Sequence, residues 1–227
     1  MDKTEYRAIE AHMHECMRDA AHDKHHIYRV LYAALDIASH EKDVDYDILI
    51  AACLLHDIGR DRQFADHSLC HAHMGGEMAY EFLTAQRGWE AEKAAHVQGC
   101  IAAHRFRRGN PPQSTEAKIL FDADKLEAAG AIGLARTFIH SGQVGEPLYI
   151  LDESGHIITE GGGAEVSSFF QEYNYKLKNV YDKFHTSRAK AIAKQRQWTT
   201  IDFYNGLHEE ITGTYQNGTA KLNKILS

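Results

Sequence analysis

Apolar residues recur at spacings of three and four along most of this chain, and proline occurs only at positions 111, 112 and 147. Such spacing places the apolar side chains on one face of an α-helix, and more prolines would interrupt the helices. The sequence therefore predicts an all-α fold. We expect helices near residues 3–20, 24–40, 45–57, 70–87, 90–104, 114–127, 128–140, 165–185 and 187–211, with a break at 109–112.

Residues 147–160 depart from the helical pattern. Two short runs rich in β-branched and aromatic residues, at 148–151 and 156–159, flank the turn-forming segment DESG. This pattern predicts a small inserted β-hairpin. Two strands alone are marginally stable, so we expect the hairpin to pack on the body of the protein or on a second subunit.

The chain has 227 residues, of which 44% are hydrophobic, and is long enough to bury a substantial single core. We therefore expect one helical domain over residues 1–227. Its main motifs lie in 19–140, the inserted arm at about 141–164 and the C-terminal helices in 165–217.

The composition argues against several classes of partner. A formal net charge of −7 disfavours nucleic-acid polymers and anionic membranes, so a small-molecule substrate fits better. The four cysteines form no C-x-x-C pair, and the charged N-terminus lacks the apolar region of a signal peptide. No window approaches the roughly 18 apolar residues of a membrane span. We expect a cytoplasmic protein with reduced cysteines.

The most informative motif is the adjacent pair His56 and Asp57 in LLHDIGRD, where an apolar helix from Ile48 to Leu55 stops at an imidazole and a carboxylate. Burying these groups at the end of an apolar segment costs free energy unless something binds them. The pair therefore predicts a metal site. The alternative is that the two residues only cap a helix.

Further ligands would come from other helices, as in metal sites inside helical bundles. In HDKHHIYRV, Asp23, His26 and Arg29 are three apart and share a helix face. KILFDADKLEAAG carries Asp122 and Asp124, which compete for one role because residues two apart on a helix do not share a face. Mixed imidazole and carboxylate ligands suit Mn²⁺, Fe²⁺, Co²⁺, Ni²⁺ or Zn²⁺ better than Ca²⁺.

Several motifs occur in an order that is typical of one superfamily: AHDKHHIYRV, LLHDIGRD, HAHMGGEMA, IAAHRF, EAKILFDADKLEAAGAIGLARTF and YKLKNVYDKFHTSRAKAIAKQR. The chain resembles the HD superfamily of metal-dependent phosphohydrolases, whose signature is H…HD…D on a helical bundle. Within it, the chain is most similar to the bacterial nucleotide pyrophosphohydrolases of the YpgQ and YedJ kind. Residues 141–167 show no family pattern.

The resemblance implies a specific set of ligands. It assigns the ligand role to Asp124, the acid before a basic residue and leucine, and leaves Asp122 as an outer or solvent-facing acid. We expect one divalent ion and favour manganese, although nickel, cobalt, iron, magnesium and zinc also fit. The implied ligands are His26, His56, Asp57 and Asp124.

Members of the superfamily that hold two metal ions use extra histidines in motifs like HAHMGGEMA and IAAHRF, which correspond here to His71 and His104. These two residues would contact a substrate phosphate or bind a second ion. The general base stays open between Asp57, Asp61 and a metal hydroxide. The catalytic candidates are therefore Asp57, Asp61, His71 and His104.

Three arginines crowd directly after His104 in HRFRRGNPP. Arg105, Arg107 and Arg108 would form a phosphate clamp, because guanidinium groups offer two parallel donors to phosphate oxygens. The alternative is a solvated turn without a ligand.

Four other cations are candidates for binding the substrate. Arg29 shares a face with His26 and could reach the substrate or pair with Asp23. Lys125 follows a proposed ligand directly. The resemblance of the tail suggests that Lys176 and Lys178 lie near the pocket mouth, although a charged helix face is usually only solvated.

These features predict a metal-dependent phosphohydrolase that acts on a nucleotide or another phosphoester. The resemblance to one branch implies hydrolysis of (deoxy)nucleoside triphosphates to monophosphate and pyrophosphate. The alternatives are a di-iron HD-type oxygenase and a nucleotide-binding HD module without turnover. The chain lacks G-x-x-x-x-G-K-[ST] and G-x-S-x-G motifs, which argues against ATP-driven chemistry and serine hydrolysis. A homodimer is compatible with the sequence.

Overall fold

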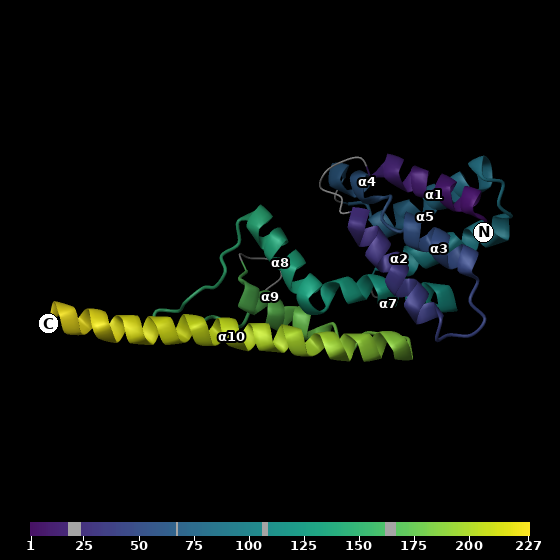
Figure 1. Cartoon of the computed structure of the whole chain (residues 1–227). Coiled ribbons are helices and arrows are strands. Elements are labelled where there is room, and N and C mark those ends of the chain that lie inside the picture. Colours follow the sequence, from purple (N-terminus) through teal and green to yellow (C-terminus); the bar gives the residue numbers. More distant parts are fainter. Residues whose placement is uncertain (18–23, 67, 106–108, 162–166) are drawn as a thin grey trace. The chain divides into compact units, whose positions relative to one another are not determined.

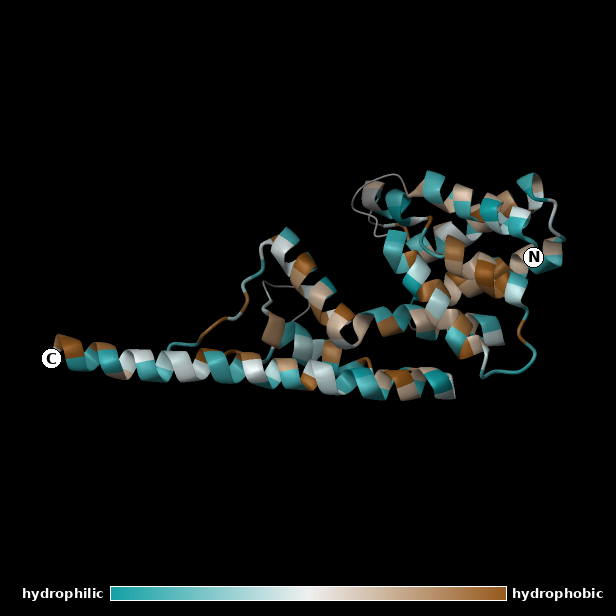
Figure 2. Cartoon of the chain, in the orientation of Figure 1, coloured by the Kyte–Doolittle hydropathy of each residue, from teal (hydrophilic) through white to brown (hydrophobic). Residues whose placement is uncertain are grey.

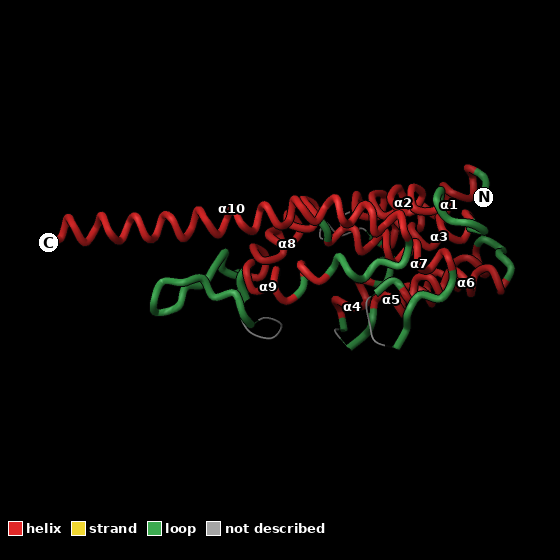
Figure 3. The backbone as a smooth tube through the Cα atoms, turned by 90° about the horizontal axis from the view of Figure 1, so that it is seen from below, coloured by secondary structure: helices red, strands yellow, loops and turns green. Residues whose placement is uncertain are grey.

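The computed structural model describes residues 1–17, 24–66, 68–105, 109–161 and 167–227 (Figure 1). Helices dominate this part of the chain, and it contains no strand (Figure 3). The prediction of an all-α fold is confirmed. The helices are α1 Lys3–Cys16, α2 Lys24–Ala38, α3 Tyr46–Leu55, α4 Arg60–Ala65, α5 His71–Glu81, α6 Ala91–Ala103, α7 Thr115–Lys125, α8 Gly130–Val144, α9 Phe169–Tyr175 and α10 Ser187–Leu226, with short turns η1 Phe82–Gln86, η2 Leu126–Ala128 and η3 Leu177–Asn179.

The chain forms two compact units. Unit 1 comprises Met1–Glu127 and Phe184–Ala189, and unit 2 comprises Ala128–Lys183 and Lys190–Ser227. Helices α1 to α7 therefore belong to unit 1, whereas α8, α9 and nearly all of α10 belong to unit 2. The expected organisation as one HD-type domain stays a prediction.

Helix α3 forms the centre of unit 1. Its residues from Ile48 to Leu55 are all apolar, and all except Ile50 are buried. A helix that is apolar on all sides is a buried one, and α3 contacts α1, α2, α5, α6 and α7. Because α3 ends at Leu55, it delivers His56 and Asp57 into the interior of unit 1.

The turn after α3 lies very close to α5. A Cβ atom on Gly59 would lie 2.3 Å from the carbonyl oxygen of His71 and 2.6 Å from the backbone nitrogen of Gly75. No larger residue fits without a shift of the backbone. The glycine in HDIGRD therefore allows the turn that carries Asp57 to approach the start of α5, which carries His71.

Three elements differ from the prediction. The six-residue helix α4 was not predicted, because its sequence RDRQFA is short and mostly polar. The helix expected at 165–185 is instead the shorter α9 followed by η3. Helix α10 has 40 residues and continues well beyond residue 211, where the prediction ended. No helix in the described part of the chain is both long enough and apolar enough to cross a membrane.

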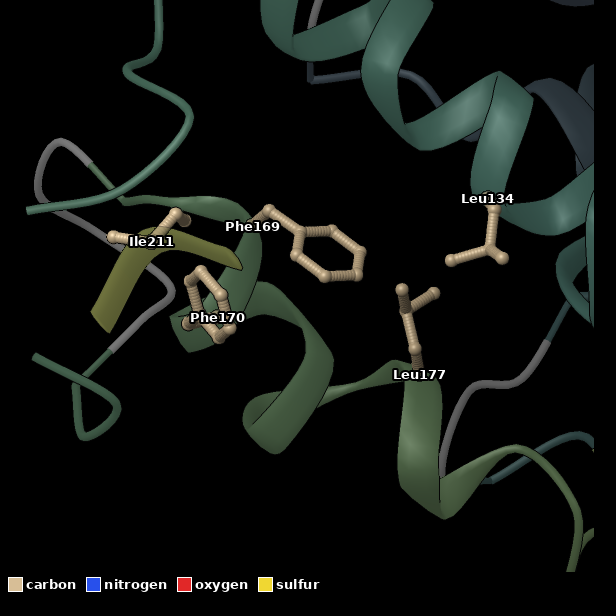
Figure 4. Close-up of a cluster of buried hydrophobic side chains, with 5 residues drawn as sticks. All are labelled: Leu134, Phe169, Phe170, Leu177 and Ile211. Atoms are coloured by element: carbon tan, nitrogen blue, oxygen red, sulfur yellow. The ribbon is translucent and has the colours of Figure 1, made fainter. Parts of the chain in front are cut away.

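Unit 2 has a hydrophobic core of its own, formed by side chains of α8, α9, η3 and α10 (Figure 4): Leu134, Phe169, Phe170, Leu177 and Ile211. Partly buried aromatic residues extend this core. The rings of Tyr173 and Tyr204, for example, stack with their centroids 4.2 Å apart. Helix α10 is therefore anchored in unit 2 up to about Ile211.

Residues 150–158 form a tight turn rather than a two-stranded arm. Leu151 and Ile157 form a single antiparallel bridge, and the N–H of Asp152 donates to the carbonyl of His156 at 2.8 Å. The carboxylate of Asp152 also accepts a hydrogen bond from the N–H of Ser154. The position of the turn agrees with the prediction, but the predicted strands were too long. Ile157 packs against the core of unit 2, so this segment rests on the body of the protein.

Candidate metal centre

Six ionisable side chains from separate segments converge inside unit 1. Five of the six, namely the four histidines and Asp57, are at most 4% exposed. Burying so many ionisable groups is unfavourable unless charge and hydrogen bonds compensate. The six are His26 of α2, His56 and Asp57 after α3, His71 at the start of α5, His104 after α6 and Asp124 of α7.

The first half of the cluster contains all four predicted metal ligands. Oδ2 of Asp57 lies 3.6 Å from Nε2 of His26 and 3.6 Å from Nε2 of His56. Oδ1 of Asp124 lies 3.3 Å from Nε2 of His26 and 4.0 Å from Nε2 of His56. Ligand atoms bound at about 2.1 Å in a tetrahedral or octahedral sphere are roughly 3.0–3.4 Å apart. His26, His56 and Asp57 could therefore hold one divalent ion after small adjustments. Asp124 approaches the two histidines, and its role as the fourth ligand stays a prediction.

The second half of the cluster uses the other oxygen of Asp57. Its Oδ1 atom lies 3.5 Å from Nε2 of His71 and 3.8 Å from Nε2 of His104. Asp57 Oδ1 and His71 Nε2 are buried and have no hydrogen-bond partner among the described residues. A buried polar atom without a partner is costly. The three residues form a second group that could hold a cation.

The four histidines all turn the same ring nitrogen toward Asp57. The Nδ1 atoms of His56 and His104 donate to the carbonyl oxygens of Cys53 at 2.8 Å and Ile101 at 2.6 Å. A carbonyl oxygen can only accept, so in the neutral ring the proton is on Nδ1 and the lone pair is on Nε2. Each histidine is thereby prepared to bind a metal through Nε2.

The orientation of His71 depends on Gln63, a residue that the sequence did not single out. The side-chain N–H of Gln63 donates to the carbonyl of Leu69 at 3.0 Å, which directs its Oε1 atom toward Nδ1 of His71 at 2.6 Å. His71 therefore donates from Nδ1, and its Nε2 atom faces Asp57 as an acceptor.

Glu127 has the corresponding role for His26, and the sequence did not single it out either. Its buried carboxylate accepts from Nδ1 of His26 at 3.2 Å and from Nε of Arg29 at 2.9 Å. A carboxylate behind a histidine fixes the ring and raises its basicity. Arg29 was predicted to reach the substrate or to pair with Asp23, and both alternatives stay predictions beside its contact with Glu127. Asp23 lies outside the described residues.

The electrostatics of the cluster favour positive charge within it. Burial alone would lower the pKa of His26, but hydrogen bonds to Asp124 and Glu127 raise it to about 9. Burial alone would raise the pKa of Asp57 and Asp124, but neighbouring histidines lower both values, helped at Asp57 by Arg60. Both carboxylates are therefore ionised at neutral pH.

Burial has the dominant effect on the other two histidines. It lowers the pKa of His71 to about 3, and, with the charge of His56, it lowers the pKa of His104 to about 4. Both rings are neutral at physiological pH, and two ionised carboxylates lie beside them. Such a set of donors suits a divalent cation.

Arg60 contacts the cluster directly and was not predicted as a site residue. Its Nε atom donates to Oδ2 of Asp57 at 2.6 Å. The side chain is 35% exposed, and its two terminal nitrogens make no hydrogen bond within the described part of the chain. They remain available for an anionic ligand.

Asp61, Lys125 and Arg105 follow residues of the cluster closely in the chain. Asp61 is exposed. Lys125 lies 5.2 Å from the ring centroid of Phe121, and a terminal nitrogen of Arg105 lies 3.7 Å from the sulfur of Cys70. Their proposed contacts with phosphate stay predictions.

The substrate-binding role of the remaining predicted cations stays a prediction. Lys176 and Lys178 belong to unit 2, where they form hydrogen bonds with Glu172 and Asn174 of the neighbouring helical turn. Arg107 and Arg108 lie outside the described residues.

The choice between the two neighbouring aspartates agrees with the geometry. Asp122 is fully buried and accepts hydrogen bonds from the backbone N–H groups of His185 and Thr186 and from the hydroxyl of Thr186. Asp122 therefore holds residues 184–189 against α7. The prediction allowed an outer or a solvent-facing role for Asp122, and the buried side chain is not solvent-facing. Asp124 points instead to His26.

Comparison with known proteins agrees with this geometry. Residues 24–129 match the model of the HD domain family. The chain is 30% identical over 198 residues to the uncharacterized protein YpgQ of Bacillus subtilis, and the match covers 86% of both chains. The chain belongs to the HD domain family.

Solved structures support the same assignment. The crystal structure of YpgQ has a TM-score of 0.70 at 26% identity, covering 92% of this chain and 97% of YpgQ. A predicted HD superfamily hydrolase from an uncultured Thermotogales bacterium has a TM-score of 0.62 at 28% identity, covering 92% and 99%. YpgQ has also been crystallised in complex with ADP. The protein is therefore a metal-dependent phosphohydrolase of the HD superfamily.

Proposed function

We propose that this protein hydrolyses nucleotides, and that it cleaves nucleoside triphosphates to the monophosphate and pyrophosphate. The observation that supports the reaction class is the buried set of His26, His56, Asp57 and Asp124, in which carboxylate oxygens of both aspartates lie 3.3–4.0 Å from Nε2 of both histidines. The complex of the related YpgQ with ADP supports a nucleotide as the substrate. The triphosphate and the site of cleavage rest on the resemblance to the pyrophosphohydrolase branch.

A divalent ion held by these four residues would polarise a phosphoryl oxygen and lower the pKa of water. The carbonyl of Cys53 and the carboxylate of Glu127 hold the Nδ1 protons of His56 and His26, so that Nε2 of each ring faces the site. Because hydrogen bonds to the neighbouring carboxylates raise the pKa of His26 to about 9, its Nε2 also carries a proton at neutral pH, and binding of an ion there would release that proton. We favour manganese as the native metal.

Arg60 is the best-placed cation for the phosphates. It contacts Asp57 through Nε only, and its terminal nitrogens can donate two parallel hydrogen bonds to phosphate oxygens. The charge of a triphosphate would thus be neutralised beside the proposed metal ligands. This role was also expected of Arg105, which contacts Cys70 directly before His71, and of Arg107 and Arg108, which lie outside the described residues.

His71 and His104 fit the role of acceptors better than that of phosphate donors. With Nδ1 protonated and the ring neutral, Nε2 offers a lone pair and no hydrogen. Such an atom can accept a hydrogen bond from water or bind a metal ion, but it cannot donate to a phosphate oxygen. Asp57 would then face a water molecule or a second ion on its Oδ1 side.

The second group of donors keeps an alternative function open. Asp57, His71 and His104 would hold a second ion, and Asp57 belongs to both groups of donors. Two iron ions held in this way would supply the redox chemistry of a di-iron oxygenase. Metal analysis separates the two functions. About one equivalent of manganese, cobalt or nickel per chain supports the hydrolase, and two irons with a mixed-valent signal support the oxygenase.

The proposed function is tested by reconstituting metal-free protein with each of Mn²⁺, Co²⁺, Ni²⁺, Fe²⁺, Mg²⁺ and Zn²⁺. Each sample is incubated with nucleoside mono-, di- and triphosphates, and orthophosphate and pyrophosphate are measured separately. We expect pyrophosphate from triphosphates. Release of orthophosphate alone would make the protein a phosphatase, and no release from any nucleotide would reject the proposal.

A further inference from the structure

The two groups of possible metal ligands differ in charge. Both contain Asp57: the first is formed by His26, His56 and Asp57, and the second by Asp57, His71 and His104. The first group also has Asp124 beside it, whose Oδ1 atom lies 3.3 Å from Nε2 of His26. The second group adds two neutral imidazoles to the shared carboxylate and no further acid. Both groups lie at the end of the hydrophobic helix α3 (Figure 2), where little water screens a charge.

The partners behind the histidines show the same difference. Nδ1 of His26 donates to the carboxylate of Glu127 at 3.2 Å, whereas Nδ1 of His71 donates to the amide oxygen of Gln63 at 2.6 Å. A carboxylate behind a metal-binding histidine raises the basicity of the ring. The amide of Gln63 orients the ring of His71 but brings no negative charge to it. His71 is therefore the weaker ligand for a cation.

Two arginines lie near His71. Nε of Arg60 donates to Oδ2 of Asp57 at 2.6 Å, and a terminal nitrogen of Arg105 lies 3.7 Å from the sulfur of Cys70, the residue directly before His71. Both charges oppose a further positive charge on the ring of His71. At the first group, two further carboxylates offset the charge of Arg60. The second group has only the shared carboxylate to set against both guanidinium groups.

We infer that Gln63 sets the number of metal ions at this centre, because its uncharged amide leaves the second group without a tightly bound ion and open to water. A water molecule there would donate one hydrogen to Oδ1 of Asp57 and the other to Nε2 of His71. These two buried atoms have no hydrogen-bond partner among the described residues. Gln63 is thus a positioning residue that acts through His71. The inference rests on the proposed function for the first ion but not for the nucleotide.

The inference is tested by titrating metal-free, full-length protein with Mn²⁺ against a chelator of known affinity and counting the bound equivalents. We expect the wild type to bind one equivalent tightly and a second at least about tenfold more weakly. Gln63→Glu keeps the shape of the side chain and adds a carboxylate behind His71. It should tighten the second equivalent by about tenfold and leave the first unchanged. Two equivalents of equal affinity in the wild type, or a folded Gln63→Glu variant with an unchanged second equivalent, would overturn the inference.

Gln113→Glu is the matched control. The side-chain amide of Gln113 donates to the carbonyl of Pro111 at 3.2 Å, as that of Gln63 does to the carbonyl of Leu69 at 3.0 Å. The control therefore removes the same kind of hydrogen bond and adds the same charge to unit 1, but not behind His71. It should leave both affinities unchanged. Equal tightening in the two variants would mean that the added charge acts through the whole protein, and the role of Gln63 would be rejected.

Gln63→Met covers the case in which the glutamate variant loses its contact with Leu69 and unfolds. Methionine has a similar length but no acceptor for Nδ1 of His71. The first equivalent should bind as in the wild type, and the second should bind still more weakly. A weakened first equivalent would show that Gln63 supports the whole cluster, and a tighter second one would show that its amide does not hold His71; either result would overturn the inference. These measurements need no nucleotide, so a failed hydrolysis assay concerns the proposed function alone.

Discussion

Replacing Glu127 by glutamine should weaken metal binding about tenfold without unfolding unit 1, because the variant removes the charge that holds His26 and preserves the shape of the side chain. Removing such a partner behind a metal-binding histidine typically costs about 10- to 100-fold in affinity, or roughly 1.4–2.7 kcal/mol. The lower end applies here for two reasons. The contact with His26 Nδ1 is 3.2 Å long, and the amide oxygen of glutamine can still accept from it.

Arg29 should contribute little to the loss. Its side chain is 34% exposed, so water screens its charge when Glu127 becomes neutral. The change in metal affinity should therefore report mainly on His26.

A second buried glutamate of unit 1 provides the matched control. Glu116 is 4% exposed, accepts a hydrogen bond from the N–H of Asp45 at 2.9 Å and lies 3.1 Å from Nε2 of His96. Glu116→Gln thus also removes a buried carboxylate paired with a histidine, but it does not touch a proposed metal ligand. It should lower the melting temperature without changing metal affinity.

The assay is a titration of metal-free protein with Mn²⁺ against a chelator of known affinity, together with thermal unfolding of each variant. If Glu127→Gln binds Mn²⁺ as tightly as the wild type, Glu127 does not hold His26 for metal binding. If Glu116→Gln weakens binding to the same extent, the effect comes from a general loosening of unit 1.

Three further predictions follow from the site. Asp57→Ala should remove bound metal and hydrolysis while circular dichroism shows the helices intact, and a full equivalent of metal in this variant would show that the ligand set is wrong. Asp124→Asn should abolish hydrolysis and weaken metal binding. Asp122→Asn should keep the metal and lower the free energy of unfolding by about 1–3 kcal/mol, since Asp122 is a buried acceptor. Metal analysis and denaturant titration check both variants, and loss of metal from Asp122→Asn but not from Asp124→Asn would contradict the assignment. Arg60→Ala should raise KM for triphosphates about tenfold and less for di- and monophosphates, whereas the neighbouring exposed Arg62→Ala should not; unchanged kinetics at unchanged metal content would remove Arg60 from the phosphate site.

The centre of the site could be predicted because its signal is local. The apolar run from Ile48 to Leu55 is followed directly by His56 and Asp57 in the sequence. In the structure this run is the buried helix α3, and the two proposed ligands follow its last residue. The remaining ligands lie on other helices, so their number and order came from the resemblance to a family. Spacing alone left Asp122 and Asp124 open, and only the buried hydrogen bonds of Asp122 show how different their roles are.

The groups that orient the ligands could not be predicted from the sequence. Glu127 is 101 residues away from His26, and no motif around either residue indicates that the two side chains are in contact. Gln63 lies in the short polar helix α4, which showed no apolar period, and its role depends on a contact with the carbonyl of Leu69. Such partners depend on how distant helices pack, and apolar periodicity does not encode the choice of a polar partner.

The same limit explains why the sequence did not single out Arg60 as a phosphate-binding candidate. Arg29 shares a helix face with His26, which placed it near the site, but the distant Glu127 takes up its charge. Arg60 lies three residues after Asp57, and its importance becomes visible only when the turn at Gly59 brings the two side chains together at 2.6 Å. Both arginines contact a buried carboxylate, but Arg60 does so through Nε alone, whereas Arg29 uses Nε and a terminal nitrogen. The two terminal nitrogens of Arg60 are the donors that match two phosphate oxygens, which is why we propose Arg60 beside Arg29 as a residue that binds the substrate.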